Sequence, residues 1–184
     1  MHRITRDHIH YSIDKAHAPV LEINPGATLV IETYDARTGT IHKDTDLLDR
    51  PHPNGANPAT GPIYVHSAEL GDTLIVDIEK IDLASEGFLA VKAGDGLLGH
   101  LAVEFATRMV PIKDGVVHFN DLRFPANPMV GVIGTAPAGD GISTSFAGPH
   151  GGNMDNKYLT EGSRVHLPVA IDGALWSLGD VHGA

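Results

Sequence analysis

Apolar and polar residues alternate in short stretches along most of this chain, and turn-forming residues separate the stretches. In the segment GDTLIVDIEKIDL, for example, a Gly-Asp turn is followed by alternation from Thr73 to Leu83. A period of two places successive side chains on opposite faces of a β-strand, so each stretch predicts a strand. Strands are expected at residues 20–23, 28–33, 62–66, 73–83, 103–112, 116–119, 164–171 and 174–178.

One stretch is apolar almost throughout instead of alternating. Residues 128–136 (PMVGVIGTA) carry two internal glycines in a run of hydrophobic residues. A strand buried on both faces has such a composition, and glycine inside a strand lets another backbone approach closely. We therefore expect a buried strand here, in close contact with a neighbouring backbone.

Two turn-and-strand units share one order of residues. NPGATLVIE (24–32) and ELGDTLIVD (69–77) both place a glycine turn before Thr-Leu and a β-branched run. We interpret them as two copies of one way of entering a strand, because no third copy indicates a repeat array. The turn at Pro25 and Gly26 also predicts that strands 20–23 and 28–33 form a hairpin or meander.

The pattern leaves little room for helices. Only two short segments, residues 7–15 and 97–107, are helix candidates. With 184 residues and 42% hydrophobic content, the chain can bury one substantial core. The expected fold class is all-β: an antiparallel β-sandwich with few short helices, forming a single domain over residues 1–184.

Composition excludes several kinds of partner. The 23 acidic and 13 basic residues give a formal charge of −10, and no Lys/Arg run is present, so neither nucleic acid nor a membrane is expected as a partner. Cysteine is absent, so any metal must be held by His, carboxylate or carbonyl groups. The amino-terminal segment has no apolar core of a signal peptide, and we expect a cytoplasmic protein.

Two Gly-rich loops carry the strongest candidates for chemistry. They are GPHGGNMDN (148–156) and LGDVHGA (178–184), and their candidate side chains are His150, Asn153, Asp155, Asp180 and His182. A turn needs Gly or Asn but no His and carboxylate beside them. The loops therefore favour a metal or polar-substrate site, although exposed polar side chains bonding their own backbone would give the same composition.

Strand geometry predicts how the two loops meet. Asp180 and His182 are two residues apart, so on an extended segment both side chains lie on one face. A hairpin between strands 164–171 and 174–178 would bring them near the loop that carries His150.

Other polar residues are weaker candidates. Asp35 directly follows a strand, where the loops of a sandwich gather, and residues 37–60 form a long polar loop of the kind that is functional or mobile. We expect most of a second polar group to be solvated, namely Glu32, His42, His52 and His66. His100 could be a metal ligand or the cap of a short helix. We assign the first histidines to a mobile amino-terminal arm: His2, His8, His10 and His17. The sequence contains no GxSxG motif, so covalent serine chemistry is not expected.

Several segments together resemble the acetamidase/formamidase family of amide hydrolases. They are ETYDARTGTI (32–41), NPATGPIYVHSAELGDTL (57–74), NPMVGVIGTAPA (127–138), GPHGGNMDNKYLTEGS (148–163) and LGDVHGA (178–184). The resemblance implies a jelly-roll-like sandwich, a homodimer or larger assembly, and hydrolysis of short amides such as formamide or acetamide. It also implies that family chains continue beyond the GDVH segment, so this chain corresponds to their amino-terminal part and is expected to be inactive alone if the missing acidic residues complete the site.

The resemblance carries site residues over by motif. His150, Asn153 and Asp155 fall in the family's HGGNMD segment, Asp180 and His182 fall in GDVH, and Asp35 falls in ETYD. Our hypothesis is that Asp35, Asp180 and His182 hold a divalent metal, with zinc preferred, that activates water. Asp155 or His150 would then move the proton, while Asn153 and the Gly151 and Gly152 amides orient the substrate.

Two alternatives remain open at this point. The same loops suit a calcium ion that only stiffens the sandwich, because Asp, Asn and backbone carbonyls are hard oxygen ligands. A non-catalytic jelly-roll module that binds small polar molecules is the second alternative.

Overall fold

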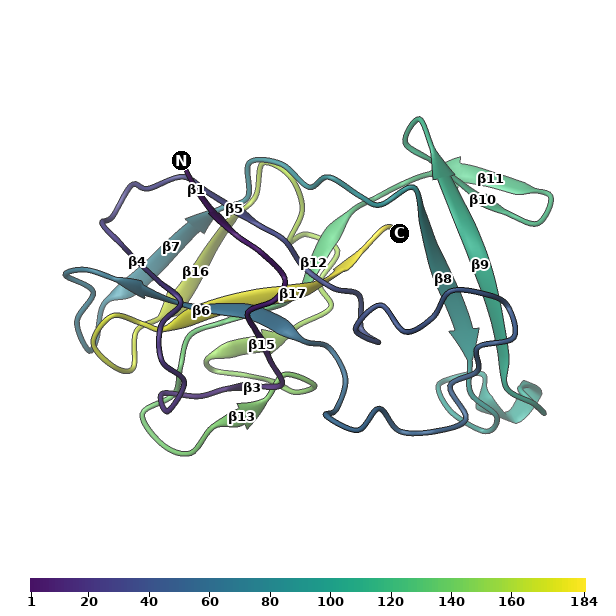
Figure 1. Cartoon of the computed structure of the whole chain (residues 1–184), viewed down its shortest axis with the longest axis horizontal. Coiled ribbons are helices and arrows are strands. Elements are labelled where there is room, and N and C mark those ends of the chain that lie inside the picture. Colours follow the sequence, from purple (N-terminus) through teal and green to yellow (C-terminus); the bar gives the residue numbers. More distant parts are fainter.

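β-strands make up nearly all of the regular structure in the computed structural model, which describes residues 1–184 (Figure 1). Its single helical element is the 3-10 turn η1 (Gly99–Leu101), too short to cross a membrane, and no helix of the structure is both long and apolar enough to do so. The two helix predictions were largely wrong. Residues 7–15 hold β2 (Ile9–His10) and β3 (Ser12–Ile13), and residues 97–107 hold only η1 before β9 begins. Pairing with distant strands overrides the local pattern there.

A seven-stranded sheet forms the centre of the molecule. Its strand order is β14-β15-β12-β17-β6-β2, and β4 also pairs with β6. These strands are β14 (Ala147–Gly148), β15 (Gly151–Asn153), β12 (Met129–Gly134), β17 (Trp176–His182), β6 (Ala59–Val65) and β4 (Leu21–Ile23). All pairs along this order are antiparallel, whereas β4 runs parallel to β6.

Short two-stranded sheets complete the body. They are β1 (His2–Ile4) with β5 (Leu29–Ile31), β7 (Thr73–Asp77) with β16 (Arg164–Pro168), and β3 with β13 (Ile142–Ser143). A four-stranded antiparallel arm projects beside the body and contains β8 (Glu86–Val91), β9 (Ala106–Lys113), β10 (Val116–Phe119) and β11 (Leu122–Pro125) (Figure 1). The prediction of an all-β, mainly antiparallel fold is confirmed.

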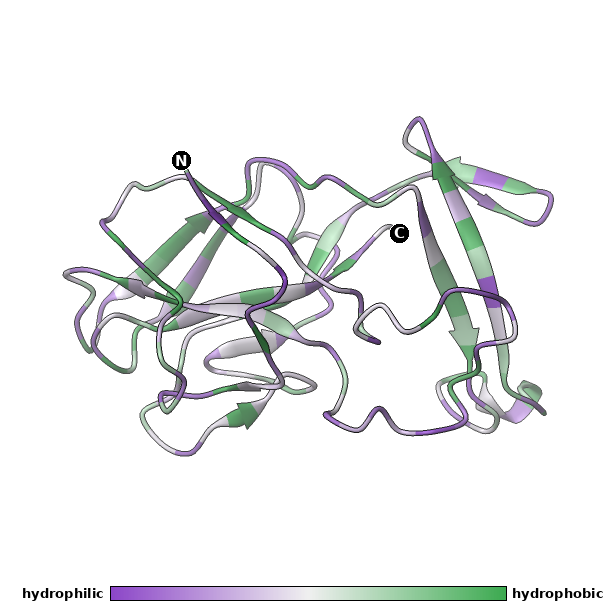
Figure 2. Cartoon of the chain, in the orientation of Figure 1, coloured by the Kyte–Doolittle hydropathy of each residue, from purple (hydrophilic) through white to green (hydrophobic).

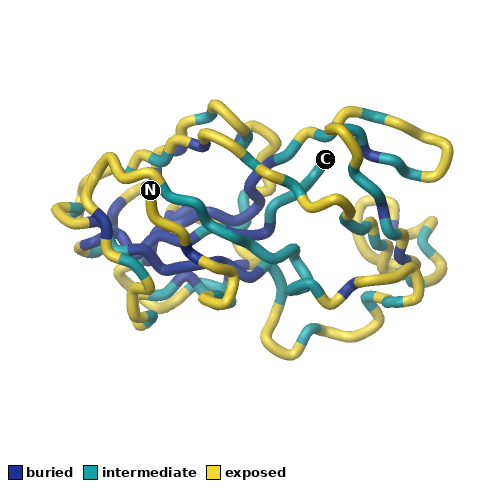
Figure 3. The backbone as a smooth tube through the Cα atoms, turned by 45° about the horizontal axis from the view of Figure 1, so that its top comes forward, coloured by how far each residue is buried: buried dark blue, intermediate teal, exposed yellow.

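The main core lies between the central sheet and the smaller sheets. Ile63 and Ile133 of the central sheet are fully buried, and they belong to one cluster with Ile4 of β1 and with Val165 and Leu167 of β16. A second, smaller cluster around Ile13 and Val132 also draws on the central sheet. Buried residues gather in the body, whereas most of the arm is exposed or intermediate (Figure 3).

The buried-strand prediction is confirmed by β12. Every residue of β12 is buried, and this strand pairs with β17 on one side and β15 on the other. A Cβ at Gly131 would lie 2.6 Å from the Asp180 carbonyl oxygen, and one at Gly134 would lie 2.7 Å from the His150 carbonyl oxygen. Both glycines therefore permit the close backbone approach that the sequence indicated.

Two predicted hairpins were wrong. β4 and β5 do not pair with each other; β4 pairs with β6 and β5 pairs with β1, both in parallel. Likewise β16 pairs with β7, while β17 lies between β12 and β6. Alternation identifies a strand but not its partner, and consecutive strands here change layers to bury their apolar faces.

The assignment of the first residues to a mobile arm was also wrong. Residues 2–13 form three strands that pair with β5, β6 and β13. His10 is only 8% exposed, and its Nε2 lies 2.9 Å from Ser177 Oγ in β17.

Candidate functional site

Three of the predicted polar residues converge on one point. One ligand atom each from Asp155, Asp180 and His182 lies within 4.8 Å of the others. His182 Nε2 lies 3.3 Å from Asp180 Oδ2 and 3.6 Å from Asp155 Oδ1, so one imidazole nitrogen faces two carboxylates. We refer to these three residues as the carboxylate–histidine cluster.

The strand β12 brings the two Gly-rich loops together. β17 carries Asp180 and His182, and Met129 of β12 is in register with His182. On the other side of β12, β15 leads to Asp155, whose backbone N–H donates to Gly131 O at 3.3 Å. The predicted meeting of the two loops is thus observed, but through a strand between them and not through the expected hairpin.

Local backbone geometry shapes the cluster. Asp155 and Asp180 have positive φ angles of 43° and 50°, which non-glycine residues adopt uncommonly and Asp tolerates better than most. Gly131 lies beneath the cluster, because a Cβ there would be 3.0 Å from Asp155 Oδ1 and 3.0 Å from His182 Nε2. The absence of a side chain at Gly131 therefore leaves the space into which these groups project.

The electrostatics of the cluster follow from hydrogen bonding at His182 and from burial at Asp155. Hydrogen bonding to Asp180 raises the pKa of His182, and the charges of both carboxylates add to this effect against the opposing effect of burial. Burial raises the pKa of Asp155, with Asp180 acting in the same direction and His182 opposing. The Asp180 side chain is only 4% exposed and Asp155 is 51% exposed, so the cluster opens to solvent on the Asp155 side. An excess of carboxylate over imidazole attracts a cation.

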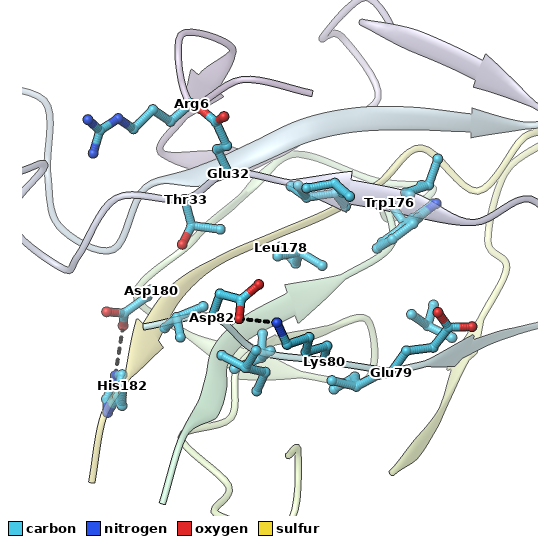
Figure 4. A pocket seen from close by; sticks show the side chains of 18 of the residues that line it. Arg6, Glu32, Thr33, Glu79, Lys80, Asp82, Trp176, Leu178, Asp180 and His182 are labelled. Atoms are coloured by element: carbon cyan, nitrogen blue, oxygen red, sulfur yellow. Dashed lines mark ion pairs between the residues drawn. The ribbon is translucent and has the colours of Figure 1, made fainter. Parts of the chain in front are cut away.

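Asp180 and His182 line a large open cleft. Trp176, Leu178, Asp180 and His182 follow one another along the cleft side of β17, because side chains two apart on a strand share a face (Figure 4). The ion pair between Asp180 and His182 is at one end of this row (Figure 4).

Asp35 lines the same cleft but is not part of the cluster. Its Oδ1 accepts hydrogen bonds from the backbone N–H groups of Arg37 at 2.7 Å and Gly39 at 3.2 Å. This carboxylate therefore fixes the turn that follows it. Its role as a metal ligand stays a prediction.

His150 is buried apart from the cluster. Its backbone oxygen accepts from Thr135 N at 3.0 Å, near the end of β12, whereas Asp155 bonds to Gly131. His150 is 5% exposed, and neither ring nitrogen has a hydrogen-bond partner within the chain. Burial lowers the pKa of His150, so the neutral imidazole is favoured.

The rest of this loop packs tightly around His150. Gly151 and Gly152 are buried with φ angles of 92° and 84°, and a Cβ at Gly152 would lie 2.8 Å from His150 Nε2. The buried Asn153 Oδ1 also lacks a partner. The alternative of ordinary exposed side chains is therefore wrong for His150, while the substrate-orienting roles of Asn153, Gly151 and Gly152 stay predictions.

The sequence did not identify two residues that support the site, Gly131 and His10. Gly131 was noted only for backbone approach, although a glycine in a buried strand also signals free space above it. His10 offered no local signal, because its partner Ser177 is 167 positions away.

Comparison with known proteins gives consistent results. The family model described as "Acetamidase/Formamidase family" matches residues 4–146 and 138–184. An acetamidase from Bacillus halodurans with a known crystal structure is 39% identical in sequence to this chain, and the two structures superpose with a TM-score of 0.96. The match covers 99% of this chain and 62% of the acetamidase chain. A predicted acetamidase/formamidase from Thermoanaerobacter tengcongensis is 42% identical, with a TM-score of 0.95 over 99% of this chain and 61% of its own.

A curated relative agrees with these structures. A putative formamidase from Schizosaccharomyces pombe is 27% identical over 87% of this chain and 54% of its own length. The chain thus spans about half the length of the curated relatives that it matches.

Proposed function

Because this chain belongs to the acetamidase/formamidase family, we propose that it supplies the metal-binding and catalytic side chains of an enzyme that hydrolyses short linear amides such as formamide or acetamide. The observation that carries this proposal is the carboxylate–histidine cluster at the edge of a cleft. Hydrolysis of such an amide gives ammonia and a carboxylate.

The donor set fits a zinc-like divalent ion. Asp155, Asp180 and His182 offer two carboxylate oxygens and one imidazole nitrogen within 4.8 Å, and catalytic zinc sites use three protein ligands with one open position. Calcium takes six to eight oxygen ligands, so an imidazole in the set favours zinc over calcium. A zinc ion bound here would lower the pKa of its water towards about 7 and polarise the amide carbonyl.

Each residue of the cluster has a distinct task in this proposal. Asp180 is buried and its Oδ2 lies 3.3 Å from His182 Nε2, so the two side chains present an oxygen and a nitrogen to one point, as two ligands of one ion would. Asp155 is half-exposed, so its carboxylate oxygen that does not hold the metal can accept a proton from water and pass it to the departing amine. Asp155 is favoured over Asp35 as the third ligand, because only Asp155 has a carboxylate oxygen within 4.8 Å of the ligand atoms of both Asp180 and His182.

Two other residues that the sequence predicted, Asp35 and His150, lie outside the carboxylate–histidine cluster. Asp35 lines the same cleft outside the cluster, and its Oδ1 is engaged by the turn that follows it. His150 keeps both ring nitrogens free of partners in a buried position, so we retain it as a second candidate for moving a proton. The homodimer stays a proposal that light scattering would test.

Ammonia release from formamide tests the function. We expect the zinc-supplemented chain to release ammonia and the His182→Ala variant to lose at least a hundredfold in kcat/KM, because an imidazole ligand is removed. His166→Ala is the matched control, since His166 is an exposed histidine on β16 and should leave the rate unchanged.

Metal analysis separates the zinc proposal from the calcium alternative. One zinc per chain, lost in His182→Ala and retained in His166→Ala, is the expected result. Calcium alone, with ammonia release unaffected by chelation, would remove the metal-activated water from the proposal.

A further inference from the structure

The long polar loop between β5 and β6 bridges the body and the arm. Figure 1 shows this loop reaching from the body to the arm and returning to β6. At its base Asn57 N donates to Ala36 O at 2.9 Å, and Tyr11 Oη lies 2.7 Å from Thr38 Oγ1, so both ends of the loop are fixed to the body. We refer to residues 37–51 of this loop as the strap.

Two acidic residues of the strap bind β9 of the arm. Asp44 Oδ2 lies 2.7 Å from Arg108 Nη1, and Asp44 Oδ1 accepts a hydrogen bond from Met109 N at 2.7 Å. The backbone oxygen of Asp46 accepts a third bond, at 2.6 Å, from the hydroxyl of the buried Thr107. Hydrogen bonds to a charged group are stronger than neutral ones, so Asp44 is the main attachment of the strap.

The pairing of β9 explains why a carboxylate binds at this place. Ile112 N donates to Ser85 O at 2.8 Å, so alternate N–H groups of β9 point towards β8. The N–H of Met109, three residues away, therefore points to the opposite side. There β10 pairs only with the last two residues of β9 and does not reach Met109. Asp44 thus takes the place of a strand partner.

The strap has little apolar contact of its own. None of residues 42–51 is buried, and only Asp46 and Leu48 are even partly covered. A pocket of about 290 Å³ separates the later part of the strap from Lys92 and Phe105 of the arm, whereas a close-packed contact would leave no such space. Polar bonds that water can replace hold the strap on the arm, so it can detach without opening a hydrophobic core.

Without the strap, the arm is joined to the body as a hinged unit. No strand of the arm pairs with a strand of the body, and the chain passes between them through the β7–β8 and β11–β12 connections. Ala126 N donates to Gly115 O of the arm at 2.8 Å, whereas Asn127 N donates to Gly183 O of the body at 2.9 Å. Consecutive residues that bind to different units mark a pivot between those units.

This pivot is next to the carboxylate–histidine cluster. Gly183 directly follows His182 along the chain. The cleft is lined by Asp180 and His182 on the side of the body and by Val110 and Ile112 on the side of the arm. The separation of arm and body therefore sets the width of the cleft at the cluster.

We propose that the strap is a releasable clasp. Its bonds from Asp44 and Asp46 to β9 hold the arm towards the body, and their loss lets the arm turn about the pivot and widens the cleft beside the cluster. Asp44 and Arg108 are both about half exposed, so the clasp weakens as the ionic strength rises. This inference concerns the position of the arm and holds whether or not the cluster binds zinc.

Distance measurements between spin labels on the arm and the body test the proposal. The chain has no cysteine, so Glu69→Cys in the body and Glu104→Cys just before β9 supply the only thiols for labelling. Both side chains are exposed. We expect one narrow distribution of distances in the labelled chain, and a distribution at least twice as broad when Asp44→Ala is added.

Two further variants make this measurement specific. Asp77→Ala is the matched control, because it also removes an Asp–Arg pair, with Arg164, but that pair lies within the body; the distribution should stay narrow. Thr107→Val removes only the bond to Asp46, so it should broaden the distribution less than Asp44→Ala does. Thr107→Val also tests the clasp if Asp44→Ala does not fold, which urea unfolding checks.

Amide hydrogen exchange at Met109 gives a second readout of the clasp. We expect this amide to exchange at least tenfold faster in Asp44→Ala, which removes its acceptor, and to change less than twofold in Asp77→Ala. A distribution that stays narrow in a folded Asp44→Ala or Thr107→Val variant, or that broadens equally in Asp77→Ala, would overturn the proposal.

Discussion

The imidazole of His10 is held neutral inside the central sheet. Its Nε2 contacts Ser177 Oγ, and its ring stacks on that of His17 with centroids 4.7 Å apart. Burial lowers the pKa of His10 to about 4, and the neighbouring His17 acts in the same direction, while Ser12 and Asp14 oppose them. Because Ser177 and Asp180 belong to one strand, His10 supports the strand that carries the cluster.

This burial predicts a loss of stability in acid. The unfolded chain takes up a proton on His10 near pH 6.5 and the folded chain only near pH 4, so the contribution is complete above pH 6.5 and is lost as the pH falls to 4. From a shift of this size we expect a loss of about 3 kcal/mol. Urea unfolding at pH 7.5 and pH 4.5 should show a smaller loss in His10→Gln, which does not titrate; equal losses in both proteins would contradict this account.

Gly131 gives a second prediction at the scale of a residue. Gly131→Ala places a Cβ 2.6 Å from the Asp180 carbonyl oxygen and 3.0 Å from two side chains of the cluster. We expect it to lower the free energy of unfolding by about 1–3 kcal/mol, as overpacking does, and to weaken zinc binding. Gly87→Ala is the control, because a Cβ there meets no atom within 4 Å. Zinc titration and urea unfolding that do not distinguish the two variants would disprove the role of Gly131.

Among the elements, β12 is the strand on which both core and site depend. Its composition could be interpreted correctly because a continuous apolar run with glycines predicts burial without reference to any partner. The pairings could not be predicted in this way. β7 and β16 are far apart along the chain, and their alternation would fit many partners equally well.

The same reasoning explains which site residues were predictable. Asp155, Asp180 and His182 could be found because their residue types are unnecessary in a turn. The separation of His150 from them depends on its position near Thr135, at the far end of β12, which only the folded sheet determines. Hydrophobic alternation likewise predicted β9, but neither β8 nor the departure of these strands from the body as an arm (Figure 2).

Truncation of β12 should cost far more than truncation of a cleft edge. Ile133 is fully buried in the main cluster, so Ile133→Ala is expected to lower the free energy of unfolding by about 2–5 kcal/mol. Ile75, which is 50% exposed on β7, is the matched control, and Ile75→Ala should cost within about 1 kcal/mol. Comparable costs in a denaturant titration would show that β12 is not the centre of the core.

At the scale of the whole molecule, the hydrophobic core is covered on one side and borders an open cleft on the other. The core is complete on the side of Ile13 and Val132, whereas the cluster that contains Trp176 is only partly covered where the cleft begins. The net charge of −10 and the paired carboxylates both favour a cation at the cleft edge. The proposed metal site thus lies at the edge of the cleft, beside the least covered part of the main core.

Anomalous diffraction at the zinc edge, from crystals of this chain grown with zinc, tests the central claim most directly. The account predicts one strong peak bounded by Asp155, Asp180 and His182, and loss of this peak in His182→Ala. A map in which the zinc lies elsewhere, with these three side chains turned apart into solvent, would contradict it.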